Sequence, residues 1–420
     1  MPVIYIVLAL AVLVLFGAPL FAIIGTISLL GFSSQSIDTA AIIVEMYRLA
    51  SQPVLLAIPL FTVSGYFLAE SKAPQRIVAL AHALIGWMPG GLAIVVLASC
   101  AIFTAFTGGS GITIVALGGL VFPILIAEKY NEKFVLGLVT TSGSLGLLFP
   151  PSLPIILYGT VAEVSIDQLF RAGIVPGILL VVVLAIYSIR QGVASKIERH
   201  PFEAKKLWTA FRNVIWEIPL PFFIIGGIYG GYFTATEAAA VTAFYVFIVE
   251  VFVYRDLKLT TDVPRVMKES MVLVGAILMI LAMAMGLTSY LIDQQIPQQL
   301  FGLIRQVVAS KIVFLMILNV FLLGIGMMME IFSAIVVVPL IVPIAKQYGV
   351  DPIHLGIIFL ANLEIAYLMP PVGMNLFMSS FRFKKTIAQV TVATFPFILV
   401  LLAGLFIITY VPQLSLWLVK

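Results

Sequence analysis

Long apolar runs separated by short polar segments make up most of the chain. The apolar residues in these runs do not alternate with polar ones, so they predict α-helices rather than the strands of a β-barrel. Since a membrane-spanning helix needs about 20 apolar residues, the pattern predicts an all-α polytopic membrane protein. The predicted crossings are residues 2–16, 18–33, 51–70, 134–162, 172–189, 214–230, 234–253, 269–290, 353–381 and 388–411.

Two apolar runs do not fit as simple crossings. Residues 87–127 are interrupted at 107–111 by the sequence Thr-Gly-Gly-Ser-Gly, and residues 312–345 are interrupted near 324–326. Glycine disfavours a helix interior, and the flanking segments place both ends of each run on one side of the membrane. The runs are therefore predicted to be re-entrant hairpins of two half-helices. The alternative for any single glycine is close packing between membrane helices.

Composition supports the membrane prediction and excludes several other classes. Hydrophobic residues make up 62% of the 420 residues and charged residues 10%, whereas a soluble chain has about 25% charged residues. The net charge of +4 lies in loops and does not indicate nucleic-acid binding. Cys100 is predicted to pack in a helix, and the three histidines lack metal-ligand spacing. The N-terminal run has no basic region before it, so it is predicted to be a retained helix.

Basic residues predict the orientation of the chain. They form five clusters between the apolar runs, and the positive-inside rule places all five in the cytoplasm. The alternating spans then put both termini on the outer side. The clusters are Lys72 with Arg76, Lys129 with Lys133, the segment 190–212, the segment 255–268, and Arg382 with Lys384 and Lys385.

The two halves of the chain share spaced landmarks. Pro123 precedes the pair Pro150-Pro151 by 27 residues, and Pro343 precedes Pro370-Pro371 by the same distance. Ten residues before each single proline stands a hydroxyl side chain, on Thr113 or Ser333. Five crossings and one hairpin in each half would invert the second copy, an arrangement found in secondary transporters. The predicted parts are a first repeat over 1–189, a cytoplasmic basic linker over 190–213 and a second repeat over 214–420.

The proline pairs suggest a chemistry for these segments. A proline removes a backbone donor and breaks the helix, and in a membrane such backbone is tolerated only beside a cavity or inside protein. The freed carbonyl oxygens suit a hard cation such as Na⁺, while the half-helix starts at Ser110 and Ser152 suit an anion. The simplest prediction is sodium-coupled uptake of an anion. For any one hydroxyl the alternative is a bond within its own helix, and Glu330 can equally cap its half-helix.

At this point the sequence resembles a known family over essentially its full length, the large membrane subunit of tripartite ATP-independent periplasmic (TRAP) transporters. The resemblance implies sodium-driven import of an organic acid, such as a dicarboxylate or sialic acid, by an elevator motion in the bacterial inner membrane. It also implies a small four-helix membrane subunit and a periplasmic substrate-binding protein as partners. The matching stretches are LLAIPLF at 55–61, PGGLA at 89–93, FPPSLPIILYG at 149–159, TEAAA at 236–240 and PPVGMNLF at 370–377.

The half-helix starts and the resemblance together give candidate site residues. Met369 stands where the family often has threonine, so its backbone carbonyl is the expected ligand there. At least two sodium ions per substrate are predicted. The expected substrate contacts are Ser110, Gly111, Thr113, Pro151, Ser152 and Asn375. The expected sodium ligands are Gly108, Gly109, Ser110, Ser144, Gly146, Phe149, Gly326, Glu330, Ser333, Met369, Gly373 and Asn375.

Three other functions remain open from the sequence. A sodium:anion symporter of similar architecture would work without a binding protein, and a channel would conduct passively. A membrane enzyme is disfavoured, because the chain has neither a His-Glu-x-x-His motif nor paired aspartates in its apolar runs. The predicted outward loops, residues 34–50, 163–171, 231–233 and 291–311, are too short to form a substrate-capturing domain. Of these, 291–311 is predicted to be an amphipathic helix on the membrane surface.

Overall fold

The computed structural model describes residues 17–35, 37–88, 90–194 and 202–419, and within these ranges the regular elements are helices. The predicted span 2–16 lies outside the described residues. Seven helices in the described part are long and apolar enough to cross a membrane, or eight if one bent pair counts as a single span. The all-α polytopic fold predicted from the apolar runs is confirmed.

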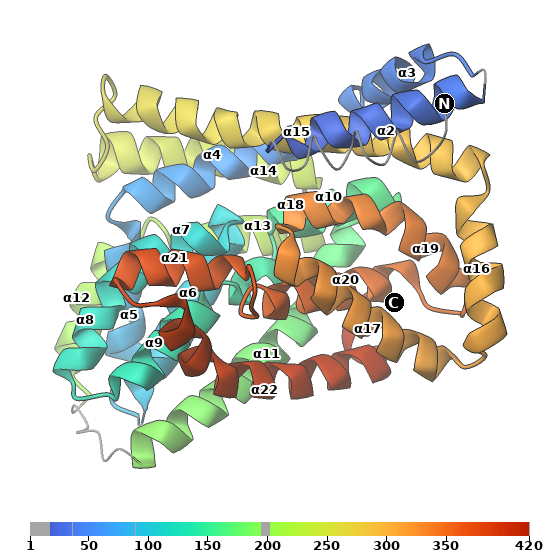
Figure 1. Cartoon of the computed structure of the whole chain (residues 1–420). Helices are drawn as coiled ribbons and strands as arrows, with labels where there is room; N and C mark the ends of the chain where they lie inside the picture. The colour runs from blue at the N-terminus through green and yellow to red at the C-terminus, as the bar shows by residue number, and fades with distance from the viewer. Residues whose placement is uncertain (1–16, 36, 89, 195–201, 420) are drawn as a thin grey trace.

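One group of helices forms a layer along one side of the molecule (Figure 1). Helix α15 contacts α2, α3 and α4, and α14 packs between α4 and α13. We call this group the first layer. It consists of α2 (Leu20–Ser34), α3 (Ala40–Ala50), α4 (Ala57–Glu70), α13 (Pro219–Tyr229), α14 (Ala235–Ile248) and α15 (Asp262–Asp293).

The remaining long helices form a second body, which we call the hairpin body (Figure 1). Helix α11 contacts α6, α20 and α22, and α22 also packs on α9. The hairpin body holds α6 (Gly91–Thr107), α7 (Ser110–Thr113), α8 (Gly119–Ala127), α9 (Glu132–Ser142), α10 (Leu153–Ala162) and α11 (Ile166–Ala194). Its later members are α17 (Lys311–Met328), α18 (Ile331–Ala334), α19 (Val338–Gln347), α20 (Pro352–Ala366), α21 (Met374–Phe383), α22 (Ile387–Tyr410) and α23 (Gln413–Leu416).

Two connecting helices join the first layer to the hairpin body. Helix α5 (Ala73–Ile85) follows α4 and packs on α6, while α16 (Ile296–Val307) follows α15 and packs on α19 (Figure 1). Arg76 of α5 donates to Glu217, to Glu250 at 2.9 Å and to Asp256 at 2.6 Å. The three carboxylates raise the pKa of the Arg76 guanidinium above its ordinary value, although burial opposes them. These ion pairs fix α5 to the segments that flank α13 and α14.

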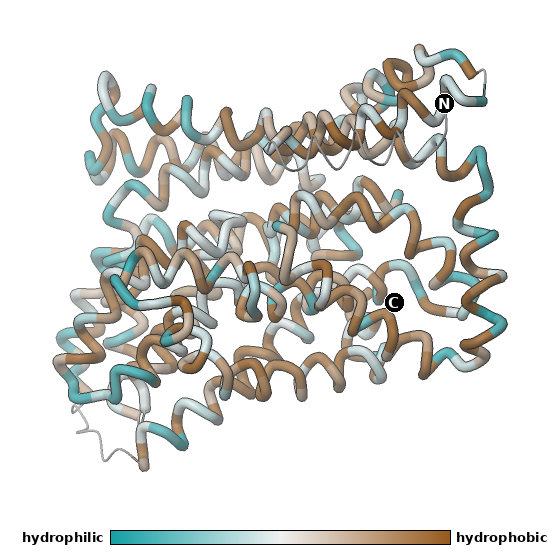
Figure 2. The backbone as a smooth tube through the Cα atoms, viewed as in Figure 1, coloured by the Kyte–Doolittle hydropathy of each residue, from teal (hydrophilic) through white to brown (hydrophobic). Residues whose placement is uncertain are grey.

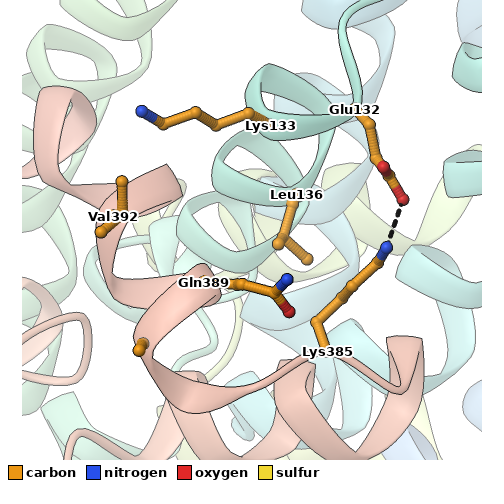
Figure 3. A pocket seen from close by; sticks show the side chains of 7 residues that line it. Glu132, Lys133, Leu136, Lys385, Gln389 and Val392 are labelled. Carbon is orange, nitrogen blue, oxygen red and sulfur yellow. Dashed lines mark ion pairs between the residues drawn. The ribbon is translucent and has the colours of Figure 1, made fainter.

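Basic segments that are far apart in sequence lie together in the structure. Lys385 pairs with Glu132 at 2.6 Å (Figure 3), and Arg265 pairs with Glu70 at 2.8 Å, next to Lys72. Hydrophilic residues gather toward the two ends of the long helices (Figure 2). These contacts bring the 129–133 region beside the 382–385 cluster and the 255–268 cluster beside Lys72, while the side of the membrane on which they lie stays a prediction.

Three amphipathic helices were not predicted. Helix α3 (Ala40–Ala50) lies in the segment 34–50 that was predicted as an outward loop, and α12 (Ala204–Asn213) lies in the predicted linker 190–213. The third is α5. All three are 10 to 13 residues long, so a search for long apolar runs misses them. The amphipathic helix predicted within 291–311 is present as α16.

The predicted helix boundaries also change at several places. Helix α15 begins at Asp262 rather than at 269, and α11 continues to Ala194, five residues past its predicted end at 189. The 87–127 run divides at Gly108, whose φ is +65°, into α6 and the helices that begin at Ser110. The 312–345 run divides after Met328, two residues beyond the 324–326 glycines, because Gly324 and Gly326 continue the helix. The inverted repeat stays a prediction.

Candidate functional site

The first helix break lies in the interior of the hairpin body. Helix α9 ends at Ser142, a 3₁₀ turn covers Leu145–Leu148, and α10 begins at Leu153. The two helical parts are bent by 45°. Residues 143–152 are buried apart from the half-buried Phe149. This break therefore places irregular backbone, with carbonyl oxygens outside a regular helix, within the protein interior.

Hydroxyl groups from the first hairpin lie against this break. The Thr104 hydroxyl donates to the Gly143 carbonyl at 2.9 Å and lies 2.7 Å from the Thr113 hydroxyl. The Ser144 hydroxyl lies 3.3 Å from the Glu364 carbonyl oxygen of α20. A Cβ on Gly146 would come within 2.3 Å of the Ala101 carbonyl oxygen. Hairpin and break thus pack so closely that their oxygen atoms form one cluster.

The second helix break joins the same cluster through Asn375. Helix α20 ends at Ala366 and α21 begins at Met374. The Asn375 backbone N–H donates to the Tyr367 carbonyl at 3.1 Å, and its side-chain amide donates to the Thr140 carbonyl at 3.3 Å. The Tyr367 hydroxyl accepts from the Ile331 N–H at 2.6 Å. The second break therefore contacts both the first break and the tip of the second hairpin.

A cavity of about 380 Å³ lies where the two hairpin tips face the first layer. The first layer supplies Tyr66, Glu70 and Leu273 to its wall. Its lining contains two carboxylates and neither lysine nor arginine. The hairpin body supplies Thr107, Gly108, Gly109, Gly111, Ile112, Val115, Ala116, Leu153, Glu330, Phe332, Met374 and Met378.

Another hollow, of about 390 Å³, lies between the starts of α9 and α22, beside the Glu132–Lys385 pair (Figure 3). It contains none of the predicted site residues.

Several buried polar atoms around the cavity and breaks have no hydrogen-bond partner within the described residues. They include the hydroxyls of Thr107, Thr141 and Ser152, the Asn375 side-chain oxygen and the Glu364 carboxylate. Leaving such a group unpaired costs about 1–3 kcal/mol. Ser152 lies at the start of α10, and its neighbour Leu153 packs on Gly108. These atoms are thus the strongest candidates for contacts with a ligand.

The structure brings most of the predicted residues together. Gly108, Gly109, Gly111 and Glu330 line the cavity, and Met374 and Met378 pack on Gly111. Buried around the first break are Ser110, Thr113, Ser144, Gly146, Pro151 and Ser152, and around the second Gly373 and Asn375, with Met369 half-buried.

Of the twelve predicted sodium ligands, Gly108, Gly109 and Glu330 line the cavity and the other nine do not; three of these nine have surroundings that bear on their assignment. Gly326 faces Leu363 and Ala366 of α20, so its position serves close helix packing. The Phe149 ring packs against Gly177 of α11, which leaves only its backbone carbonyl as a candidate ligand. Ser333 is half-buried in α18, and its hydroxyl is absent from the cavity wall. Their assignment as ligands stays a prediction.

Several residues of the site were missed from the sequence. Tyr66 and Glu70 lie on a helix predicted as an ordinary span, and no local signal marks them. Met374 and Met378 are spaced four apart just after the second proline pair, so they share a face of α21. This spacing is a signal that sequence reasoning could have used. Thr107 begins the predicted glycine interruption, and Thr104 stands three residues before it. Hydroxyl side chains so close to a predicted hairpin tip are a second signal that sequence reasoning could have used.

A multi-pass helical protein with two interrupted helices around an internal cavity has the architecture of a secondary transporter. A family model described as "Tripartite ATP-independent periplasmic transporter, DctM component" matches residues 7–414. The chain belongs to this family. It is thus the large permease subunit of a TRAP transporter, as the resemblance implied.

Curated relatives cover nearly the whole chain. The C4-dicarboxylate TRAP transporter large permease protein DctM of Pseudomonas aeruginosa is 37% identical over 394 residues, which are 93% of this chain and 92% of the relative. The corresponding protein of Rhodobacter capsulatus is 35% identical and covers 96% of both chains. The ectoine/5-hydroxyectoine TRAP transporter large permease protein UehC of Ruegeria pomeroyi is 33% identical, with 98% and 97% covered. These names are those of transporter permeases and not of enzymes.

A solved structure shares the fold. The YdaH transporter of Alcanivorax borkumensis aligns with a TM-score of 0.63 over 90% of this chain and 87% of that one, at 13% sequence identity. At this identity the likeness concerns the fold alone.

Proposed function

We propose that the chain imports a small organic acid coupled to sodium, and that a substrate-binding protein delivers the acid. The observation that carries the proposal is the cavity at which both hairpin tips and the starts of α10 and α21 meet the first layer. Named relatives transport C4-dicarboxylates, and another relative transports ectoine and 5-hydroxyectoine. A small solute carrying a carboxylate is therefore the substrate class that we expect.

Sodium would bind at the two helix breaks. A hard cation requires oxygen ligands. The first break offers the backbone carbonyl oxygens around Gly143 and Ser144, together with the hydroxyls of Thr104 and Thr113. The second break offers the Met369 carbonyl and the Asn375 side-chain oxygen, which has no hydrogen-bond partner in the part of the chain that the structure describes. The side-chain amide of Asn375 donates to Thr140 in the helix before the first break. Filling one ion site would thus affect the geometry of the other.

The acid would bind in the cavity beside these ions. Its carboxylate requires donors, and the cavity wall supplies the hydroxyls of Thr107 and Tyr66; Ser152 is fully buried next to Leu153 of that wall, so the start of α10 must open for its hydroxyl and backbone N–H groups to reach the acid. The cavity wall carries the Glu70 and Glu330 carboxylates; Glu70 is paired with Arg265 at 2.8 Å, so among the described residues Glu330 is the wall carboxylate without an ion pair. Bound sodium would offset this negative charge, so the acid would bind tightly only after sodium. This order of binding provides the coupling.

The division into two bodies supports an elevator motion. The cavity lies between the first layer and the hairpin body, and it reaches Glu70 at the end of α4, next to the basic segment at Lys72. A hollow of about 420 Å³, with Arg48, Glu163 and Lys346 in its wall, lies between the same two bodies. A shift of the hairpin body along the first layer would expose the site to either side.

The tripartite family supports two partners, the small membrane subunit and the periplasmic binding protein. A relative named "Isethionate TRAP transporter permease protein DctMQ" is 34% identical, and the matched region is 58% of its length. We place the protein in the bacterial inner membrane with both termini on the periplasmic side. A stand-alone sodium:anion symporter is the second candidate function, because the cavity and breaks alone suffice for sodium-dependent binding of an acid.

Reconstitution tests the proposal. Proteoliposomes holding the chain with its small subunit and a loaded binding protein should accumulate a C4-dicarboxylate or ectoine when sodium is high outside. Replacing sodium by potassium should abolish accumulation, and liposomes with the chain alone should show none. Accumulation that is unchanged in potassium would reject sodium coupling. Sodium-dependent accumulation of free acid by the chain alone would establish the stand-alone symporter instead.

A further inference from the structure

An apolar crevice of about 220 Å³ lies between a connecting helix, the first hairpin and the first layer. Its walls come from Ile77 and Leu80 of α5, Ile102 and Phe106 of α6, and Phe222 near the start of α13. The exposed fraction is 46% for Ile102 and 70% for Phe222. Because an exposed apolar surface in a membrane protein faces hydrocarbon, the crevice has the character of a site for an acyl chain.

Helix α12 lies directly before the crevice and presents three different faces. Ala210 and the following Val214 are buried, and α12 packs on α5. Trp208 and Phe211 are exposed on the next face, with their rings stacked at 6.0 Å. Helical spacing places Lys205 and Arg212 on the adjoining polar face. Aromatic side chains beside basic ones are typical of a helix in the membrane interface.

The basic face and the crevice adjoin each other in the fold. Val214, Glu217 and Ile218 line the crevice, and Val214 directly follows the end of α12 at Asn213, so this end of the helix, with Arg212 in its last turn, lies next to the crevice. Arg76 pairs with Glu217 of the crevice wall, and it already forms ion pairs with three carboxylates. Lys206 is paired with Glu203 at 2.7 Å. Lys205 and Arg212 are exposed and, within the described residues, form none of the ion pairs.

We propose that α12 and the crevice form a binding site for one anionic phospholipid of the cytoplasmic leaflet. An acyl chain lies among Ile77, Ile102 and Phe222, and the headgroup phosphate binds Lys205 and Arg212 while Trp208 sits at the headgroup level. The anionic cytoplasmic leaflet supplies such lipids and attracts basic residues that lie near its surface. The site is separate from the proposed transport site and does not depend on it.

Lipid binding to the purified full chain in detergent tests the site. Native mass spectrometry should show phosphatidylglycerol binding at least fivefold more tightly than phosphatidylcholine with the same acyl chains. The double substitution Lys205→Gln with Arg212→Gln should remove that preference, whereas Lys384→Asn, a basic residue at another loop, should keep it. Higher salt should weaken the preference as well, because the basic side chains are exposed.

A second pair of variants tests the crevice. Ile102→Trp should fill it and reduce binding of both lipids at least fivefold. Ile178→Trp is the matched control, because Ile178 is 50% exposed on α11 and absent from the crevice wall. Equal binding of the two lipids to the unsubstituted chain, or an unchanged preference in the double variant, would overturn the proposal. Loss of the bound lipid when the small subunit associates would also overturn it, since the surface would then be a protein interface.

Discussion

The two helix breaks have the same sequence landmarks but different surroundings. In the first, residues 143–152 are buried apart from half-buried Phe149, beneath α6, α11 and α20. In the second, Pro370, Pro371 and Val372 are exposed, with Val372 at 44%. Both proline pairs have a cis peptide bond. The surroundings of each break are determined by the helices packed around it.

This difference suggests different roles for the breaks. The first break is enclosed by neighbouring helices, so its oxygen cluster has a fixed geometry suited to an ion. The second break is enclosed on one side only, where Asn375 and Gly373 are buried against the hairpin body. It can change shape at Pro370–Val372 without moving a neighbouring helix. We therefore expect substitutions that add bulk in the first break to affect folding, and those that add bulk in the second to affect transport.

The largest expected effect is on folding, from Gly146→Ala. The added Cβ would lie 2.3 Å from the Ala101 carbonyl oxygen and 2.4 Å from the Ala105 nitrogen, both on the backbone of α6. Overpacking of this kind costs about 1–3 kcal/mol or more. The yield of monodisperse protein on size-exclusion chromatography should fall severely. Gly324→Ala, with nothing within 4 Å of the added atom, should leave the yield unchanged.

Gly373→Ala sharpens this contrast. Here the added Cβ would come within 2.4 Å of the Met369 carbonyl oxygen, within the break itself. The variant should fold with a near-normal yield but lose most sodium-dependent uptake, because the Met369 carbonyl is displaced. If Gly146→Ala folds normally while Gly373→Ala does not, the assignment of a rigid first break and an adaptable second break is wrong.

Asn375→Ala should reduce uptake at limiting sodium roughly tenfold, the effect of about 1.4 kcal/mol. The substitution removes the side-chain bond to the Thr140 carbonyl and a candidate ion ligand. Uptake should recover in part as sodium is raised, so the measurement is the sodium concentration for half-maximal rate. A purely structural role would lower the maximal rate and leave this concentration unaltered.

Ser152→Ala separates substrate binding from stability. The Ser152 hydroxyl is buried without a hydrogen-bond partner, so its removal should leave the unfolding temperature unchanged or slightly raised. The apparent affinity for the acid should nevertheless weaken several-fold. The control is Thr160→Val in the same helix, since Thr160 donates within α10 to Ile156 at 2.8 Å. Equal affinities in Ser152→Ala and the unsubstituted chain would remove Ser152 from the substrate contacts.

The smallest effect is expected from Val372→Ala, less than twofold on the uptake rate. Val372 is exposed and contributes little packing. A large loss of uptake in this variant would show that the exposed side of the second break contacts a partner or closes against the first layer during transport.

The sequence predicted much of this architecture. Long apolar runs predicted the helical membrane fold, and the proline pairs and the glycines at 107–111 marked positions where helices are in fact interrupted. The second interruption was misplaced, because Gly324 and Gly326 are tolerated within α17, which ends where Met329 and Glu330 adopt extended backbone. Glycine composition alone does not determine where a helix ends.

The site was predicted only in part, for a related reason. Residues next to the breaks, such as Ser144 and Asn375, carry local sequence signals. Tyr66, Glu70 and Leu273 contribute to the cavity from helices that are remote in sequence, and their inward position depends on tertiary packing. The ion pairs of Arg76 with Glu217, Glu250 and Asp256 are likewise long-range contacts. Neither set has a periodicity or spacing that reveals it in a single sequence.

The central claim, that sodium binds at the two breaks, can be tested without knowing the acid or the partners. A ligand that binds the folded state raises its stability by mass action. The unfolding temperature of the purified chain should therefore be higher in sodium chloride than in potassium chloride at equal ionic strength. The difference should shrink in Ser144→Ala and in Asn375→Ala, and it should persist in Val372→Ala. Equal unfolding temperatures in the two salts for the unsubstituted chain would contradict the account.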